Sequence, residues 1–315
     1  MRFAALCPAV PTAIGALMLL GCASTPMPAI PDDPNAALEL GAGLLPDHPQ
    51  QARYVLESID ASAFDRAQRE RLDFHVTQAL AGSGDLWDAY QRARDFAANS
   101  RFSEYQPRLQ ELHYRIGVAL LDRDRGYFIF GSDQEDGRIV LSDFVERYPT
   151  DPNTASALQR LGEEDFEAGR WDEARRRYER IIEDHPDSEW IPLAHFRRPM
   201  AQFNALVGPE YDLPSMRRAR AELRDYLLVR KPERPDFREP AEVALRTVER
   251  WIAMRYEIDA DYYRTLGNRP GEAHWLRVLL AEFPDHERAT ALQERLAAAE
   301  ATGTPVATPP GEVRS

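Results

Sequence analysis

Residues 158–186, LQRLGEEDFEAGRWDEARRRYERIIEDHP, decide the fold of this 315-residue chain. Apolar residues recur at intervals of three and four in the first part of the stretch and again in the second, which is the spacing of two amphipathic helices. Gly169 lies between the two parts and Pro186 follows the second, where glycine and proline commonly end helices. The stretch therefore predicts a helix–turn–helix unit.

The same stretch resembles the tetratricopeptide repeat, a helix–turn–helix unit of about 34 residues. With Pro186 at the closing proline of that repeat, the signature positions hold Leu158, Leu161, Gly162, Ala174, Tyr178 and Ile181. The aromatic residue usual on the first helix is displaced from position 165 to Phe166. We expect small Gly162 and Ala174 to lie where the two helices cross, and Tyr178 to fill the seam with the next repeat.

Similar helix pairs cover most of the remaining chain. One ends at Pro284; another ends at Pro149 and carries Ile139, Phe144 and Val145 on its second helix, after an insertion at 125–136. Weaker pairs cover about 64–98 and 35–60, two more helices cover 190–231, and a last helix covers about 287–300. We predict an all-α, tetratricopeptide-like solenoid of about 12 helices, in which each repeat packs only on its neighbours.

The N-terminal segment has the pattern of an export signal. Arg2 is the only charge in the first 31 residues, and the apolar run 3–20 is marginal in length for crossing roughly 30 Å of hydrocarbon. The sequence LLGC at 19–22 resembles the bacterial lipobox, which implies a signal peptide over 1–21 and acylation of Cys22, including a palmitate chain. An ordinary signal peptide that happens to end near a cysteine is the alternative.

Lipidation would also explain the cysteine content. The chain has two cysteines, and cleavage before Cys22 leaves that residue with no partner for a disulfide. Because Ala23 rather than aspartate follows, the resemblance implies the outer membrane, on its periplasmic face. We expect a Pro-rich tether over 22–34, a repeat domain over 35–300 and a disordered tail over 301–315.

The C-terminal part resembles the BamD family, outer-membrane lipoproteins of the β-barrel assembly machinery. The resemblance rests on IAMRYEIDADYY at 252–263, LAEFPD at 280–285, FIFGSDQED at 128–136 and FVERYPTD at 144–151. It implies that C-terminal repeats hold a BamA-like barrel component and that N-terminal repeats receive unfolded outer-membrane proteins. Residues 35–100 match the family poorly. A different periplasmic tetratricopeptide lipoprotein, scaffolding cell-envelope synthesis or division proteins, is the alternative.

Two sets of residues are candidates for partner binding. On the first helix of the best repeat, helical spacing places Gln159, Glu163, Phe166 and Glu167 on the groove face. Phe166 is either an aromatic plate for a ligand or a packing residue within the helix pair. In the last repeat the resemblance points to Tyr262, Tyr263, Trp275 and Arg277. Trp275 takes the place of the basic contact of the family, with Arg277 two residues further on.

The sequence carries no signal for catalysis. It has no His-Glu-x-x-His, Gly-x-Ser-x-Gly or Gly-x-Gly-x-x-Gly motif and no P-loop, and its seven histidines are scattered. A net charge of −13 argues against nucleic-acid binding, which requires a basic face. We therefore expect a binding scaffold rather than an enzyme, with no cofactor, no metal and no small-molecule substrate.

Overall fold

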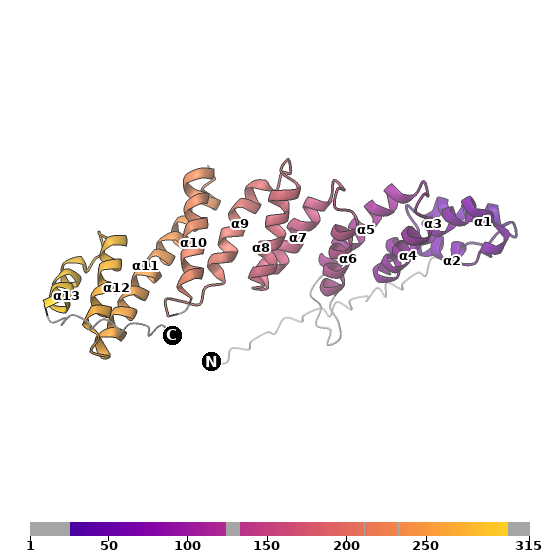
Figure 1. The fold of residues 1–315 in the computed structure, drawn as a ribbon. Coiled ribbons are helices and arrows are strands. Elements are labelled where there is room, and N and C mark those ends of the chain that lie inside the picture. The colour runs from indigo at the N-terminus through magenta and orange to yellow at the C-terminus, as the bar shows by residue number, and fades with distance from the viewer. Residues whose placement is uncertain (1–25, 124–132, 211, 232–233, 302–315) are drawn as a thin grey trace, which may run out of the picture. The chain divides into compact units, whose positions relative to one another are not determined.

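The chain is all-α in a computed structural model that describes residues 26–123, 133–210, 212–231 and 234–301 (Figure 1). Within these ranges there are 13 α-helices, one short 3-10 helix and one π-helical turn, and no strand. The predicted fold class, a helical-repeat protein, is confirmed. None of the helices within the same ranges is both long enough and apolar enough to cross a membrane.

The first compact unit ends at Gly84. Its helices are α1 (Pro34–Leu44), α2 (Pro49–Glu57) and α3 (Arg66–Ser83). Asp65 caps the start of α3 in a reciprocal box with Gln68, which supplies partners for backbone N–H groups that a helix start leaves open. The Gln68 side chain also donates to Asn35 at 2.7 Å and so connects α3 to α1.

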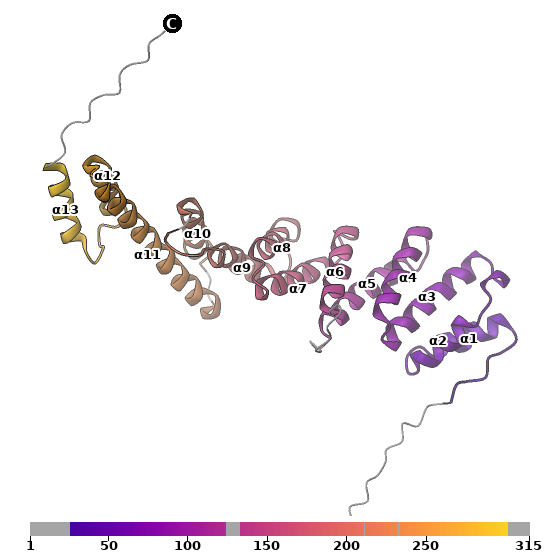
Figure 2. The same ribbon diagram turned by 90° about the horizontal axis from the view of Figure 1, so that it is seen from below.

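The second compact unit begins at Asp85 and is built from consecutive helices, most of which pack on the next one along the chain (Figure 2). They are α4 (Leu86–Asn99), α5 (Gln106–Leu121), α6 (Asp133–Arg147), α7 (Thr154–Glu167), α8 (Trp171–Asp184), α9 (Ile191–Asn204), α10 (Leu213–Asp225), α11 (Pro235–Thr265), α12 (Arg269–Glu282) and α13 (Ala289–Ala301). A π-helical turn, Tyr226–Arg230, follows α10 directly.

The best repeat folds as its sequence predicts. Gly169 adopts a φ of +72° between α7 and α8, a left-handed conformation that glycine reaches without strain. Gly162 faces the ring of Tyr178, and a Cβ at this position would lie 2.9 Å from Tyr178 Cζ. Ala174, Tyr178 and Ile181 are fully buried. The small residues therefore allow α7 and α8 to approach closely, as expected.

Several predicted details need correction. The division at Gly84 and Asp85 falls inside the expected 64–98 pair, so α3 and α4 belong to different units. Ile139 is 43% exposed because its neighbours Val140 and Leu141 take the core positions of α6. The expected insertion is shorter than predicted, since residues 133–136 form the first turn of α6.

Some predictions fall on residues that the structure does not describe. Cys22, the signal segment 1–21 and residues 302–315 of the predicted tail lie outside the described ranges, as do residues 124–132. Residues 26–33 of the predicted tether carry no regular secondary structure, and α1 begins at Pro34. The lipid anchor and the predicted domain limits stay predictions.

Candidate functional site

The longest helix, α11, has two apolar faces. One face is a stripe of buried residues, with steps of three or four, that runs from Ala241 through Val248 and Tyr256 to Ala260. These residues pack with α10, α12 and α13 in one core cluster. A helix that needs only this stripe for its core would be polar on its other faces.

The second apolar stripe of α11 is exposed. It consists of Met254, Ile258, Tyr262 and Leu266, one residue every four positions, and their exposed fractions range from 38% to 60%. Residues four apart are neighbours on a helix surface, so the four side chains form one row. At about 1.5 Å per residue the row is about 18 Å long. We call this row the α11 stripe.

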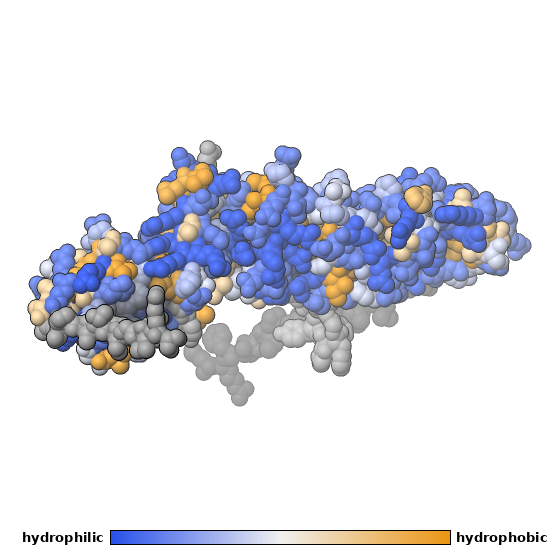
Figure 3. Space-filling view, viewed as in Figure 1, coloured by the Kyte–Doolittle hydropathy of each residue, from blue (hydrophilic) through white to orange (hydrophobic). Residues whose placement is uncertain are grey.

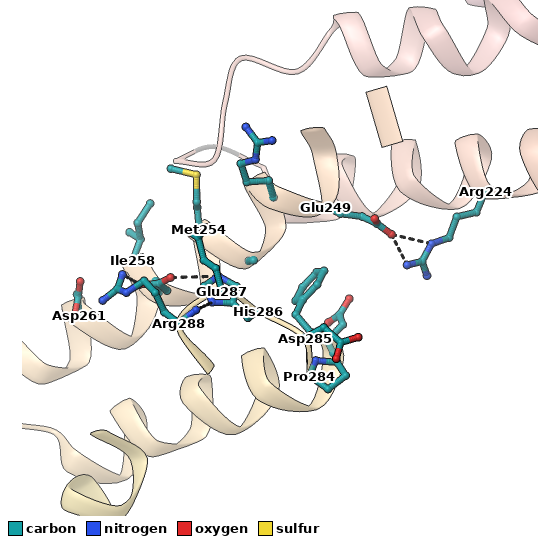
Figure 4. A pocket seen from close by; sticks show the side chains of 15 residues that line it. Arg224, Glu249, Met254, Ile258, Asp261, Pro284, Asp285, His286, Glu287 and Arg288 are labelled. Atoms are coloured by element: carbon teal, nitrogen blue, oxygen red, sulfur yellow. Dashed lines mark hydrogen bonds and ion pairs between the residues drawn. The ribbon is translucent and has the colours of Figure 1, made fainter. Parts of the chain in front are cut away.

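The start of the stripe forms the floor of a groove with a volume of about 750 Å³. Figure 4 shows Met254 and Ile258 of α11 opposite the turn between α12 and α13, residues 284–288, with Arg224 of α10 at one end and Asp261 at the other. We call this space the α11 groove. It has room for side chains of a partner, and apolar floors with polar rims are typical of binding sites.

The rim of the α11 groove is predominantly acidic. Six carboxylates and three arginines line it. Two of the arginines are already paired: Arg288 donates to Glu257 at 2.6 Å, and Arg224 hydrogen-bonds Glu249. Asp285 and Glu287, both exposed, make no ion pair with any residue that the structure describes.

A buried ion-pair cluster holds the turn that forms one wall. Glu272 of α12 is fully buried and accepts hydrogen bonds from Arg269 at 2.9 Å and from Arg295 of α13 at 2.7 Å. Arg295 also contacts Asp261 of α11 at 2.8 Å. Because one arginine bridges three helices, the position of α13, and with it the wall of the groove, is fixed by charge pairing as well as by apolar packing.

Sequence reasoning missed Glu272. Its distance from Gly267 equals the distance of Ala174 from Gly169, so the repeat pattern predicts a small residue there. A carboxylate at a small-residue position was the available signal. The adjacent Ala273 is also buried, as the shifted pattern suggested.

Tyr256 anchors the floor from beneath. Its hydroxyl donates to Glu282 at 2.7 Å and accepts from Arg217 at 2.6 Å, while its ring is completely buried. Burial raises the pKa of Tyr256, so the hydroxyl stays protonated and the network stays intact at neutral pH. Trp275 stacks on this ring with centroids 5.6 Å apart.

The structure separates the four residues predicted in the last repeat. Tyr262 lies in the exposed α11 stripe. Tyr263 packs on Gly271, where an added Cβ would meet its ring at 2.5 Å, and half-buried Trp275 packs on Tyr256. Arg277 is exposed as expected, but it is paired with Glu300 of α13 at 2.8 Å. Only Tyr262 therefore joins the candidate site directly.

Two of the candidates in the best repeat, Glu163 and Phe166, make contacts with other residues of the same chain. Glu163 accepts from the Tyr178 hydroxyl at 2.7 Å and from Arg197 of α9 at 2.8 Å. Phe166 lies between the Trp171 ring, 5.1 Å away, and the Arg197 guanidinium, 4.3 Å from its centroid. The structure thus favours the packing role for Phe166 over an open aromatic plate.

The two remaining groove-face candidates, Gln159 and Glu167, are polar and lie at the surface of the same helix. Gln159 is half-buried and Glu167 is exposed. The apolar surface that a partner could bury there is therefore small compared with the α11 stripe.

Asp165 is a second residue that sequence reasoning missed. It occupies the usual aromatic position and is completely buried. Three arginines surround its carboxylate: Arg170 at 2.7 Å, Arg138 of α6 at 3.3 Å and Arg177 of α8 at 3.8 Å. A buried carboxylate with several cationic partners connects three successive helices and stiffens this repeat.

A second groove, of about 410 Å³, lies at the turns before α7 and α9 and is lined by residues of 150–156 and 184–190. The face in Figure 3 is mostly hydrophilic, with apolar patches at the end of α10 and around α12 and α13. Within the described ranges no group of three histidine, cysteine, aspartate or glutamate residues could hold a metal ion.

Comparison with known families agrees with the fold. Residues 154–188 match the model of a tetratricopeptide repeat family. This stretch contains α7 and α8, and repeats of this kind commonly form protein-binding surfaces. No protein with a curated description matches the chain.

Proposed function

We propose that this tetratricopeptide-repeat protein is a lipid-anchored periplasmic scaffold in outer-membrane β-barrel assembly. One observation carries the proposal. The segment 252–263, which resembles the last repeat of the BamD family, is also the segment of α11 that exposes Met254, Ile258 and Tyr262 beside the α11 groove. The C-terminal repeat would hold a BamA-like barrel component there, and the N-terminal repeats would receive unfolded barrel precursors.

The energetics support a docking role for the stripe. Fully burying a large apolar side chain is worth about 1.5–3 kcal/mol, and a few aromatic and aliphatic anchors supply most of the affinity of an interface. The four stripe residues are already half-exposed on a rigid helix, so a partner that covers them has little ordering cost on this side. The α11 stripe is therefore a preorganised apolar surface that a partner can cover without rearranging this helix.

The anchor follows from the lipobox resemblance at Cys22. Two or three acyl chains, at about 0.8 kcal/mol per buried methylene, give lasting attachment to a membrane. Cys22→Ser should release the protein into the soluble periplasmic fraction and abolish labelling with radioactive palmitate. Label retained by the variant would contradict the anchor.

The partner is tested by capture of a tagged protein from detergent-solubilised envelopes. Recovery of a BamA-like component supports the proposal, whereas recovery of envelope-synthesis or division proteins without any barrel-assembly component favours the alternative scaffold. Ile258→Asp should reduce capture, because it places a charge in the row that the partner covers.

Arg277 serves as a separate probe of the last repeat. If it contacts the partner itself, Arg277→Glu should weaken capture more than Glu300→Gln does. Equal effects of the two variants would mean that the Arg277–Glu300 pair acts only by holding α13.

A further inference from the structure

The spacing and length of the α11 stripe favour an α-helix as the partner. Its residues follow each other at four-residue steps along one helix, which makes a ridge of the kind that interdigitates with the ridges of another α-helix. The length of about 18 Å matches about 12 residues, or a little over three turns, of a partner helix. Such a helix would need apolar residues at spacings of three and four on one face only.

The charges around the α11 groove indicate which charged residues the polar face of the partner helix should carry. The lining has three more carboxylates than arginines. Since Arg288 and Arg224 are occupied by Glu257 and Glu249, the charges of the lining that are unpaired among the described residues are two carboxylates on the turn, Asp285 and Glu287, and one arginine, Arg250, on α11. An excess of one negative charge remains, and both unpaired anions lie on the turn. Both are exposed and lie at the edge of the contact, where charges set the orientation of a partner and the discrimination between partners.

We infer that the α11 groove binds a cationic amphipathic helix, whose apolar face covers Met254 and Ile258 and whose lysine or arginine residues approach Asp285 and Glu287. The inference rests on the proposed scaffold function and names the chemistry of the docking segment. An acidic helix of the same shape would meet like charges on the turn and bind more weakly.

Two fluorescent peptides test the preference against the full-length protein in detergent. Both are stapled helices of 16 residues with the same apolar face, one with lysine and the other with glutamate at the solvent-facing positions. Fluorescence anisotropy should show the basic peptide binding at least about tenfold more tightly, with a difference that shrinks as salt is raised. Equal affinities, or tighter binding of the acidic peptide, would overturn the inference.

Two variants locate the binding. The double variant Asp285→Asn, Glu287→Gln should reduce the preference for the basic peptide by about three- to tenfold, the range expected for two exposed ion pairs. Ile258→Ser should weaken both peptides by about fivefold or more, since apolar contact is lost. Val243→Ser, which changes an exposed aliphatic residue of the same helix that does not line the groove, should weaken neither.

The outcomes separate this inference from the function proposed above. A preference unchanged in the double variant, or equal effects of Ile258→Ser and Val243→Ser, places the peptide elsewhere and overturns the inference. Both positions of the double variant are exposed, so this variant remains informative if Ile258→Ser lowers the helical signal. Peptide preference without envelope capture of a barrel-assembly component would overturn the proposed function alone. Concentration-dependent self-association that competes with the peptides would show that a second copy of this chain occupies the groove instead.

Discussion

Replacement of Gly162 by alanine should destabilise the best repeat, although alanine is the better helix former. The new Cβ would lie 2.9, 3.1 and 3.3 Å from three atoms of the Tyr178 ring. The ring has little freedom to move away, because its hydroxyl is bonded to Glu163, which Arg197 holds in turn. The contact must therefore be relieved by a shift of α7 against α8.

The size of the loss follows from two opposing effects. Overpacking in a close-packed core costs about 1–3 kcal/mol, and a ring held at its far end lies in the upper part of that range. The change from glycine to alanine inside a helix returns about 1 kcal/mol. We expect a net loss of about 1–2 kcal/mol in the free energy of unfolding, which for a unit of this size lowers the midpoint by about 2–4 °C for each kcal/mol.

Tryptophan fluorescence is the appropriate probe. All five tryptophans lie in the second unit, so the signal reports the unit that contains Gly162 without a contribution from the first. Tyr178→Phe supplies the matched background, because it frees the ring from Glu163 and should make the added methyl less costly. The reasoning is refuted if Gly162→Ala raises the midpoint, or if it costs as much with phenylalanine at position 178 as with tyrosine.

Three further predictions concern the core. Ala174→Leu should cost about 1–3 kcal/mol by overpacking the α7–α8 crossing, and an unchanged urea midpoint would contradict the repeat register. Burial lowers the pKa of His113 to about 4 from its ordinary value near 6.5. The contribution of neutral His113 to the free energy of unfolding is therefore complete above pH 6.5 and is lost as the pH falls towards 4, by about 3 kcal/mol in all. The measurement is the difference in the free energy of unfolding between wild type and His113→Phe across that pH range. Asp165→Ala should cost about 3–5 kcal/mol because it removes the buried anion that three half-buried arginines share, whereas Asp122→Ala, at an exposed ion pair, should cost less than about 1 kcal/mol in the same chemical denaturation.

The helical fold could be predicted because its signals are local. Apolar spacing of three and four residues, with glycine or proline after each run, fixes the helices from short windows of sequence. Gly169 and Gly267 both end helices in the left-handed conformation, as their positions predict. The division after Gly84 could not be predicted, since this glycine also ends its helix in the left-handed conformation and so resembles an ordinary repeat turn.

The buried charges could not be predicted from the repeat pattern. Asp165 and Glu272 lie where the signature has an aromatic and a small residue, and their partners Arg138 and Arg295 are more than 20 residues away in sequence. Pairing over that distance depends on how neighbouring helices pack. The spacing of residues within one helix therefore cannot predict these ion pairs.

The candidate site was only partly predictable for a related reason. The helix α11 carries two rows of apolar residues, both at helical spacing, and periodicity alone does not say which row faces the core. Resemblance pointed to Tyr262, but Met254 and Ile258, which form the floor of the groove, were not singled out. Ile139 is the opposite case: the sequence predicts it in the core because of its helical spacing, but the structure exposes it.

Site-specific photo-crosslinking in growing cells tests the central claim most directly. A photoreactive phenylalanine analogue at Ile258 lies in the α11 stripe, and the same analogue at Ile139 provides an equally exposed apolar position on α6. We expect a discrete adduct from position 258, identified by mass spectrometry as a β-barrel assembly component, and no such adduct from position 139. The same adducts from both positions, or an adduct from position 258 only to envelope-synthesis or division proteins, would contradict this expectation.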